Sequence, residues 1–172
     1  MATTYTLISS VTVGSGGAAN IEFTSIPQTY TDLVIQLSGR GTGAGGEVSA
    51  TLQFNNNSSN YSSRWLRGSG AAASSGSDTY GTDEIYLFEM PAASATASTF
   101  QNGSIYIPNY TSSNNKSVSV DSVSENNGTT AWAYLTAGLW SNSAAITSIK
   151  FLIQIGNYAQ HSTAYLYGIS NA

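Results

Sequence analysis

The chain has 172 residues, of which 41% are hydrophobic, 11% aromatic and only 8% charged, and its formal net charge is −4. This length suits one domain, and the composition supplies enough apolar residues for a core and too little charge for a disordered chain. Its five Lys and Arg residues are too few for the clustered cations of a nucleic-acid or membrane-surface binder. Without Cys and with a single His, the chain cannot form disulfides or thiolate metal sites.

Most of the chain alternates between apolar and polar residues, which is the pattern of strands with one face on a core and the other in water. Breaks rich in Gly, Ser and Asn separate these runs, as expected for turns. The pattern predicts one domain over residues 1–172, an antiparallel, jelly-roll-like β-sandwich of about ten strands. In chain order, the expected strands cover residues 5–13, 19–26, 32–39, 48–54, 84–90, 103–107, 116–124, 131–139, 146–155 and 163–169.

Two long breaks interrupt this series, at residues 55–80 and 91–98. We expect the first to be a long irregular crossover, and such loops are unusual in compact domains unless they have a function. It is interpreted either as a surface connection between sheets or as an arm that contacts a neighbour. The strands also contain little of the charge and proline that protect sheet edges, so either loops cover these edges or another subunit pairs with them, which is a first indication of an oligomer.

Two glycine-rich stretches fit dinucleotide-binding fingerprints, G-x-G-x-x-G at residues 41–46 and its variant ending in Ala at residues 14–19. The fingerprint works where a strand leads into a helix whose N-terminus meets the pyrophosphate. Here each stretch is followed by another alternating run, so both are interpreted as hairpin loops.

Candidate groups for chemistry are few. Asp78, Asp83 and Glu84 gather around one turn, where a hard cation could bind, although a solvated loop is the preferred interpretation. His161 has no nucleophile and acid arranged around it in sequence, and Asp121 is interpreted as a solvated strand residue. We therefore predict no catalytic residue, no metal, no cofactor and no enzymatic activity.

The tryptophans are more informative. Trp65 lies in the first break, between Arg64 and Arg67, two of the five cations of the chain. Tryptophan and arginine are frequent anchors of protein interfaces, so these three residues are our candidates for contact with a partner or ligand, while burial of Trp65 under the loop is the alternative interpretation. Trp132 and Trp140 share the parity of one predicted strand and are assigned to the core.

Both ends of the chain carry recognisable motifs. Residues 26–33 read IPQTYTDL after a predicted strand, and residues 156–169 contain a GNY turn and a closing LYGI strand. In these motifs, and in the order of strands between them, the chain resembles small virion structural proteins of tailed bacteriophages. Residues 55–97 take no part in the resemblance.

The resemblance implies a jelly-roll-like subunit on the outer surface of a phage particle, made in the host cytoplasm. It would be a capsid decoration or cement protein that stabilises the shell, in contact with the major capsid protein or with fibre subunits, and a homo-oligomer, with a trimer favoured. The alternative is a carbohydrate-binding module of a tail or head fibre that recognises host surface glycan. In that case Tyr61, Trp65 and Tyr80 would form the stacking surface. Neither function involves nucleic acid or a membrane.

Overall fold

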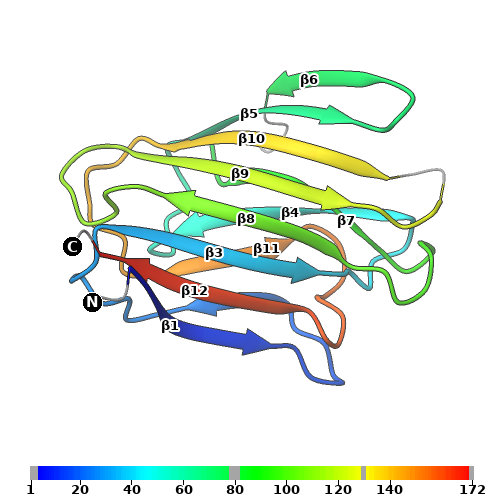
Figure 1. Cartoon of the computed structure of the whole chain (residues 1–172), viewed down its shortest axis with the longest axis horizontal. Helices are drawn as coiled ribbons and strands as arrows, with labels where there is room; N and C mark the ends of the chain where they lie inside the picture. The colour runs from blue at the N-terminus through cyan, green and yellow to red at the C-terminus, as the bar shows by residue number, and fades with distance from the viewer. Residues whose placement is uncertain (1–3, 78–81, 129–130, 171–172) are drawn as a thin grey trace.

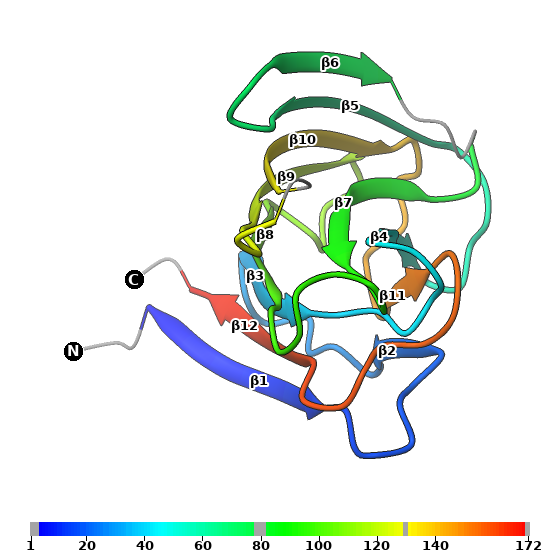
Figure 2. The same cartoon turned by 90° about the vertical axis from the view of Figure 1, so that its right-hand side faces the viewer.

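The computed structural model describes residues 4–77, 82–128 and 131–170, which form twelve strands and no helix. The strands make two packed antiparallel sheets, one of eight strands and one of four, and the predicted β-sandwich is confirmed. Figure 1 shows the larger sheet in front, from β1 at one edge to β6 at the other, and Figure 2 shows the two layers side by side.

The strands in chain order are β1 (Tyr5–Thr12), β2 (Asn20–Phe23), β3 (Asp32–Gly39), β4 (Glu47–Phe54), β5 (Tyr61–Gly68), β6 (Ala73–Ser77), β7 (Ile85–Pro91), β8 (Gln101–Ile107), β9 (Lys116–Ser124), β10 (Trp132–Trp140), β11 (Ile149–Ile153) and β12 (Thr163–Ile169). In space, the larger sheet runs β1-β12-β3-β8-β9-β10-β5-β6 and the smaller one β2-β11-β4-β7.

Eight of these strands form a jelly roll. They pair in nested order, β1 with β12, β2 with β11, β3 with β8 and β4 with β7, while successive pairs alternate between the two sheets. This winding of a long antiparallel ribbon into two sheets is the arrangement that the sequence predicts.

The other four strands extend the larger sheet beyond β8, in the order β9-β10-β5-β6. They come from two insertions, β5–β6 between β4 and β7, and β9–β10 between β8 and β11. The smaller sheet ends at β7, and Figure 2 shows β5 and β6 reaching past it. The inner face of this extension therefore needs cover other than a complete second sheet.

The predicted irregular crossover at residues 55–80 is wrong, because β5 and β6 lie within it and form a hairpin. All eight residues of β5 pair with β10, from Tyr61 opposite Trp140 to Gly68 opposite Ala133. The ten predicted strands overlap the other ten observed strands, so these two account for the difference in number.

The break at residues 91–98 is a loop held to the end of β3 by Arg40. The Arg40 guanidinium donates five hydrogen bonds of 2.8–3.2 Å to this loop and its end. Its acceptors are the carbonyl oxygens of Ala92, Ala95, Thr96 and Thr99 and the Thr99 hydroxyl. One of the scarce cations thus orders a loop that lacks regular structure.

Candidate interaction surfaces

The β5–β6 hairpin divides the predicted contact residues between two faces of the sheet. Side chains alternate along a strand, so Arg64 and Leu66 point to the outer face of the larger sheet, which faces away from the smaller sheet. Trp65 and Arg67 point to the inner face. Arg64 is exposed and donates a hydrogen bond of 2.8 Å to the carbonyl oxygen of Ser63. Trp65 and Arg67 are half-buried.

Arg67 is enclosed by aromatic rings on the inner face. Its guanidinium carbon lies 4.2 Å from the ring centroid of Trp132, 4.9 Å from that of Trp65 and 6.0 Å from that of Tyr134. The same guanidinium donates hydrogen bonds to the Tyr134 hydroxyl, at 3.0 Å, and to the Ser74 hydroxyl, at 3.2 Å. We call Trp65, Arg67, Trp132 and Tyr134 the arginine cage.

The arginine cage continues to the smaller sheet through Glu47 of β4, which accepts a hydrogen bond from the Trp132 indole. Partial burial raises the pKa of Glu47, as does the neighbouring Glu89, while the Trp132 hydrogen bond and the charge of Arg67 act in the opposite direction. Tyr134 also packs edge-on against Tyr86 of β7, with ring centroids 6.1 Å apart. The arginine cage therefore joins the extension to the jelly roll.

The rings of the arginine cage are poor platforms for stacking a sugar. The guanidinium of Arg67 lies over both tryptophans, and the Trp65 indole also lies against Gly76 of β6, where an added Cβ would be 2.5 Å from its Cζ2 atom. These contacts cover ring surface that a pyranose would need.

The remaining predicted contact residues are Tyr61 and Tyr80. Tyr61 is only 2% exposed, and its hydroxyl accepts a hydrogen bond of 2.8 Å from the backbone amide of Phe54. Its ring stacks on Trp140, with centroids 6.0 Å apart, so it packs in the core and is not available to a partner. Trp140, as predicted, is buried, whereas Trp132 is only partly buried and packs against the core. Tyr80 lies outside the described residues.

A different surface stands out on the larger sheet. Among the described residues, seven of the eight exposed large hydrophobic side chains lie on strands of this sheet and face away from the smaller one. The charged groups of this outer face, within its described strands, are Asp32, Arg64 and Asp121. The seven hydrophobic residues are Tyr5, Leu7, Leu66, Tyr106, Val123, Leu135 and Tyr165.

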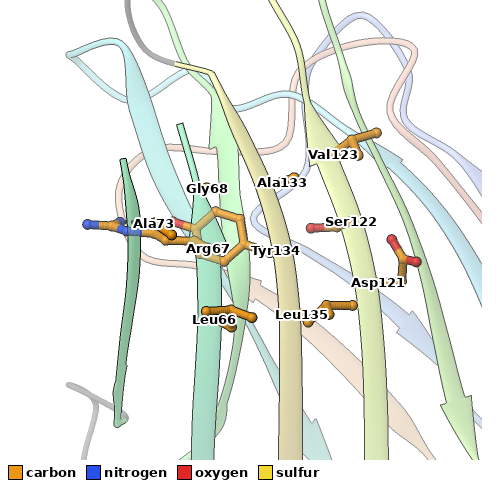
Figure 3. Close-up of a pocket in the computed structure, with 10 residues that line it drawn as sticks. All are labelled: Leu66, Arg67, Gly68, Ala73, Asp121, Ser122, Val123, Ala133, Tyr134 and Leu135. Carbon is orange, nitrogen blue, oxygen red and sulfur yellow. Dashed lines mark hydrogen bonds between the residues drawn. The ribbon is translucent and has the colours of Figure 1, made fainter. Parts of the chain in front are cut away.

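These side chains form two groups. Near the β1 edge, Leu7 is opposite Tyr167, and Tyr106 is opposite Val34 in the same row. On the extension, Leu66 is opposite Leu135, which is opposite Asp121, so a row of two leucines and a carboxylate crosses β5, β10 and β9. Figure 3 shows this row, with Val123 and Ala133 beside it.

The leucine row separates two shallow hollows. One, of about 320 Å³, is lined mainly by apolar residues of β5, β9 and β10, including Val123 and Ala133. The other, of about 420 Å³, lies on the opposite side of the row and includes Arg64 and Ala137. Leu66 and Leu135 line both hollows.

The other sequence motifs do not assemble into a site. Residues 41–46 connect β3 to β4, two strands, and the structure provides no helix there for a pyrophosphate. Glu84 is buried and accepts hydrogen bonds from Thr51 and Gln154, and Asp78 lies outside the described residues. No three His, Asp or Glu side chains of the described ranges come together as metal ligands. His161 is exposed at a turn, with φ of 73°.

The sequence analysis did not identify the outer face. The signal is an apolar side chain at a position of the strand that alternation assigns to solvent. An example is Leu135, which lies between the inward-facing Tyr134 and Thr136. This signal does not by itself indicate an exposed apolar face, because a single sequence does not say which face of a strand is covered.

The chain matches no model of a known protein family, and no curated protein matches it in sequence. The resemblance to phage virion proteins therefore stays a prediction.

Proposed function

We propose that the protein is a non-enzymatic structural protein of a bacteriophage virion that buries the outer face of its larger sheet against neighbouring subunits. The observation that carries this proposal is the gathering of seven exposed hydrophobic side chains on one face with few charges. Exposed apolar surface of this kind marks interaction sites. A broad sheet face suits another protein surface better than a small ligand, whose sites are concave.

The fold and the resemblance support a more specific form of the proposal. Jelly rolls occur in viral capsid proteins and in lectins, and a fold alone does not assign a function. The motifs at residues 26–33 and 156–169 favour the virion, and within it a capsid decoration or cement protein at the outer surface. Its partners would be the major capsid protein or fibre subunits.

The low charge of the chain fits this role physically. A contact made of apolar and neutral polar groups loses little strength when salt screens charges. A standard stable interface buries about 800 Å² on each partner, which a face of eight strands can supply. Such contacts between neighbouring subunits would add mechanical stability to a shell.

The group near the β1 edge provides the test. The test adds purified protein to shells of the virus that encodes the chain, prepared without this protein. The double variant Leu7→Lys, Tyr165→Lys should fail to bind these shells. The matched control is Ile155→Lys, because Ile155 is the exposed large hydrophobic residue of the described chain that lies off this face. Co-sedimentation measures binding, and the temperature of DNA release measures stabilisation.

Shells that lack the protein and survive heating as well as complete shells would overturn the cementing role. Equal binding by the double variant and the control would overturn the assignment of the face. The carbohydrate alternative would gain if a glycan array showed binding that Tyr106→Ala or Tyr165→Ala abolishes, since these are exposed aromatic residues of the face.

A further inference from the structure

Arg64 differs from the other four cations of the chain. The others are engaged by groups of the chain itself, whereas Arg64 is exposed and donates only to the carbonyl oxygen of the preceding residue, among the described residues. Arg40 holds the loop at residues 91–98, Arg67 lies in the arginine cage, the buried Lys116 donates to the carbonyl oxygens of Ser112 and Asn114, and Lys150 lies 3.8 Å from Glu22.

Asp121 is the complementary case. Its carboxylate is exposed and makes no hydrogen bond or ion pair within the part of the chain that the structure describes. Arg64 lies on β5 and Asp121 on β9, with β10 between them, and both face outward. Among the described residues of a chain with so few charges, one cation and one anion without a charged partner thus share one face.

The surface between these two charges is shaped to receive a copy of itself. Leu66 and Leu135 form a ridge, and a hollow lies on either side of it. Arg64 borders one hollow and Asp121 the other. A surface with a ridge, an adjacent hollow and one charge of each sign on opposite sides is self-complementary.

We propose that this part of the outer face pairs with the same part of a second copy of the chain about a two-fold axis. In this isologous contact, Arg64 of each copy meets Asp121 of the other, so both ion pairs form at once. We assign this surface to a second copy of the chain because Arg64 and Asp121 supply both charges of each ion pair. Leu66 and Leu135 likewise supply both the ridge that enters a hollow and the side of the hollow that receives it.

Ideal sheet dimensions agree with this pairing. With strands about 4.8 Å apart and alternate residues about 6.8 Å apart, the two-fold axis that relates the two charge pairs lies at right angles to the line from Arg64 to Asp121 and crosses it over β10, between Ala137 and Leu135. Rotation about it places Leu66 of one copy over the hollow beside Ala133 of the other. The strands of the two copies then cross steeply, as in orthogonal packing of sheets.

Charge reversal in the purified full chain tests the proposal. Light scattering over a dilution series should show a particle of twice the 17.9 kDa chain mass for the unmodified protein. Arg64→Glu or Asp121→Arg alone should raise the dissociation constant roughly tenfold to a hundredfold, because each sets like charges together twice. The double variant R64E/D121R should restore the dimer, because opposite charges meet again.

Four results would overturn the proposed dimer. They are an unmodified chain that is monomeric, an unmodified chain that is trimeric, a dimer that the single charge reversals leave intact, and a double variant that stays dissociated. Circular dichroism on each variant checks that the fold is retained, and Ile155→Lys serves as an exposed control that should not change the dissociation constant. The inference goes beyond the virion role and does not depend on it, since it concerns the isolated chain. Leu7→Lys with Tyr165→Lys should impair shell binding while leaving the dimer intact.

Discussion

Tyr30 and Gly168, which belong to the two motifs at opposite ends of the sequence, are in contact in the fold. Gly168 of β12 is opposite Leu33 of β3, and the Tyr30 ring lies over it, so an added Cβ would be 2.6 Å from Cδ1 of that ring. The amide of Thr31 also donates a hydrogen bond of 2.7 Å to the carbonyl oxygen of Ile169. The glycine of the closing LYGI motif is thus explained by the tyrosine of the opening motif.

Substituting Gly168 should reveal this dependence. Gly168→Ala forces a methyl group into the Tyr30 ring, and we expect a loss of about 1–3 kcal/mol in the free energy of unfolding. In a Tyr30→Ala background the same substitution should be neutral or stabilising, because alanine in a strand costs less conformational entropy than glycine. Urea denaturation of the four proteins at one concentration gives the coupling energy of the cycle. Equal costs in both backgrounds would show that the ring does not determine the residue at position 168.

At the scale of the element, the β5–β6 hairpin is the part of the fold that the sequence analysis missed. β6 reads ASSGS, and all but Gly76 of its residues are exposed, so it shows no alternation of apolar and polar residues. Its neighbour β5 is a strand because β10, far along the chain, offers a full ladder of hydrogen-bond partners. On its inner face the hairpin is completed by the arginine cage and by Gly76 beneath Trp65.

Gly76→Ala tests the hairpin as a unit. The new methyl group would displace the Trp65 indole from Arg67, and we expect a loss of about 1–3 kcal/mol, concentrated in the hairpin. Hydrogen exchange should then accelerate at residues 61–77 much more than in β3 or β12, and tryptophan fluorescence should shift towards that of an exposed indole. Ser75→Ala is the matched control in the same strand, because Ser75 faces outward and should change stability by less than about 0.5 kcal/mol. Unchanged exchange in G76A would contradict the role of the arginine cage.

At the scale of the whole molecule, stability depends on buried tyrosines. Burial raises the pKa of Tyr61 to about 12, despite its backbone hydrogen bond with Phe54, and it also raises the pKa values of Tyr86 and Tyr158. The pKa of Tyr134 is raised by burial as well, although its hydrogen bonds to Tyr86 and Arg67 oppose the shift. These residues come from both sheets and from the loop before β12, so the whole sandwich protects them.

Alkaline pH should therefore unfold the protein. In the unfolded chain these tyrosines lose protons near pH 10, while the native state keeps them, so stability is intact below pH 10 and is lost as pH rises towards 12. Each such tyrosine contributes a slope of about 1.4 kcal/mol per pH unit in this window. Burial lowers the pKa of Lys116, and this shift makes stability rise with pH. It is the effect of one group, whereas four tyrosines act in the opposite direction.

Urea denaturation between pH 8 and pH 12 measures this profile, and tyrosinate absorbance follows ionisation in the native state. Tyr61→Phe should reduce the slope of the free energy of unfolding against pH, between pH 10 and 12, by the contribution of one tyrosine. This reduction is expected whatever the effect of the substitution on stability at pH 8. A stability that stays level to pH 11, or native tyrosines that all ionise near pH 10, would contradict the prediction.

Alternation along single strands was enough to predict the β-sandwich and ten of its strands, because period two is a local property of a strand with one buried face. The apolar stretches and their turns are contiguous in the sequence, as in β3 and β9, and need no knowledge of a partner. The scarcity of catalytic and metal-binding groups was likewise a property of composition.

Tertiary structure alone decided which residues form the surfaces. Trp65, Arg64 and Arg67 are close in sequence, and alternation along β5 puts Arg64 on one face and the other two on the opposite face, but only the pairing with β10 brings Trp132 and Tyr134 to Arg67 and forms the arginine cage. The outer face is assembled from strands far apart in the chain, so the row from Leu66 through Leu135 to Asp121 exists only once β5, β10 and β9 are paired. The physical reason is that strand pairing brings together residues that no local pattern relates, while the local pattern determines only which residues share a face.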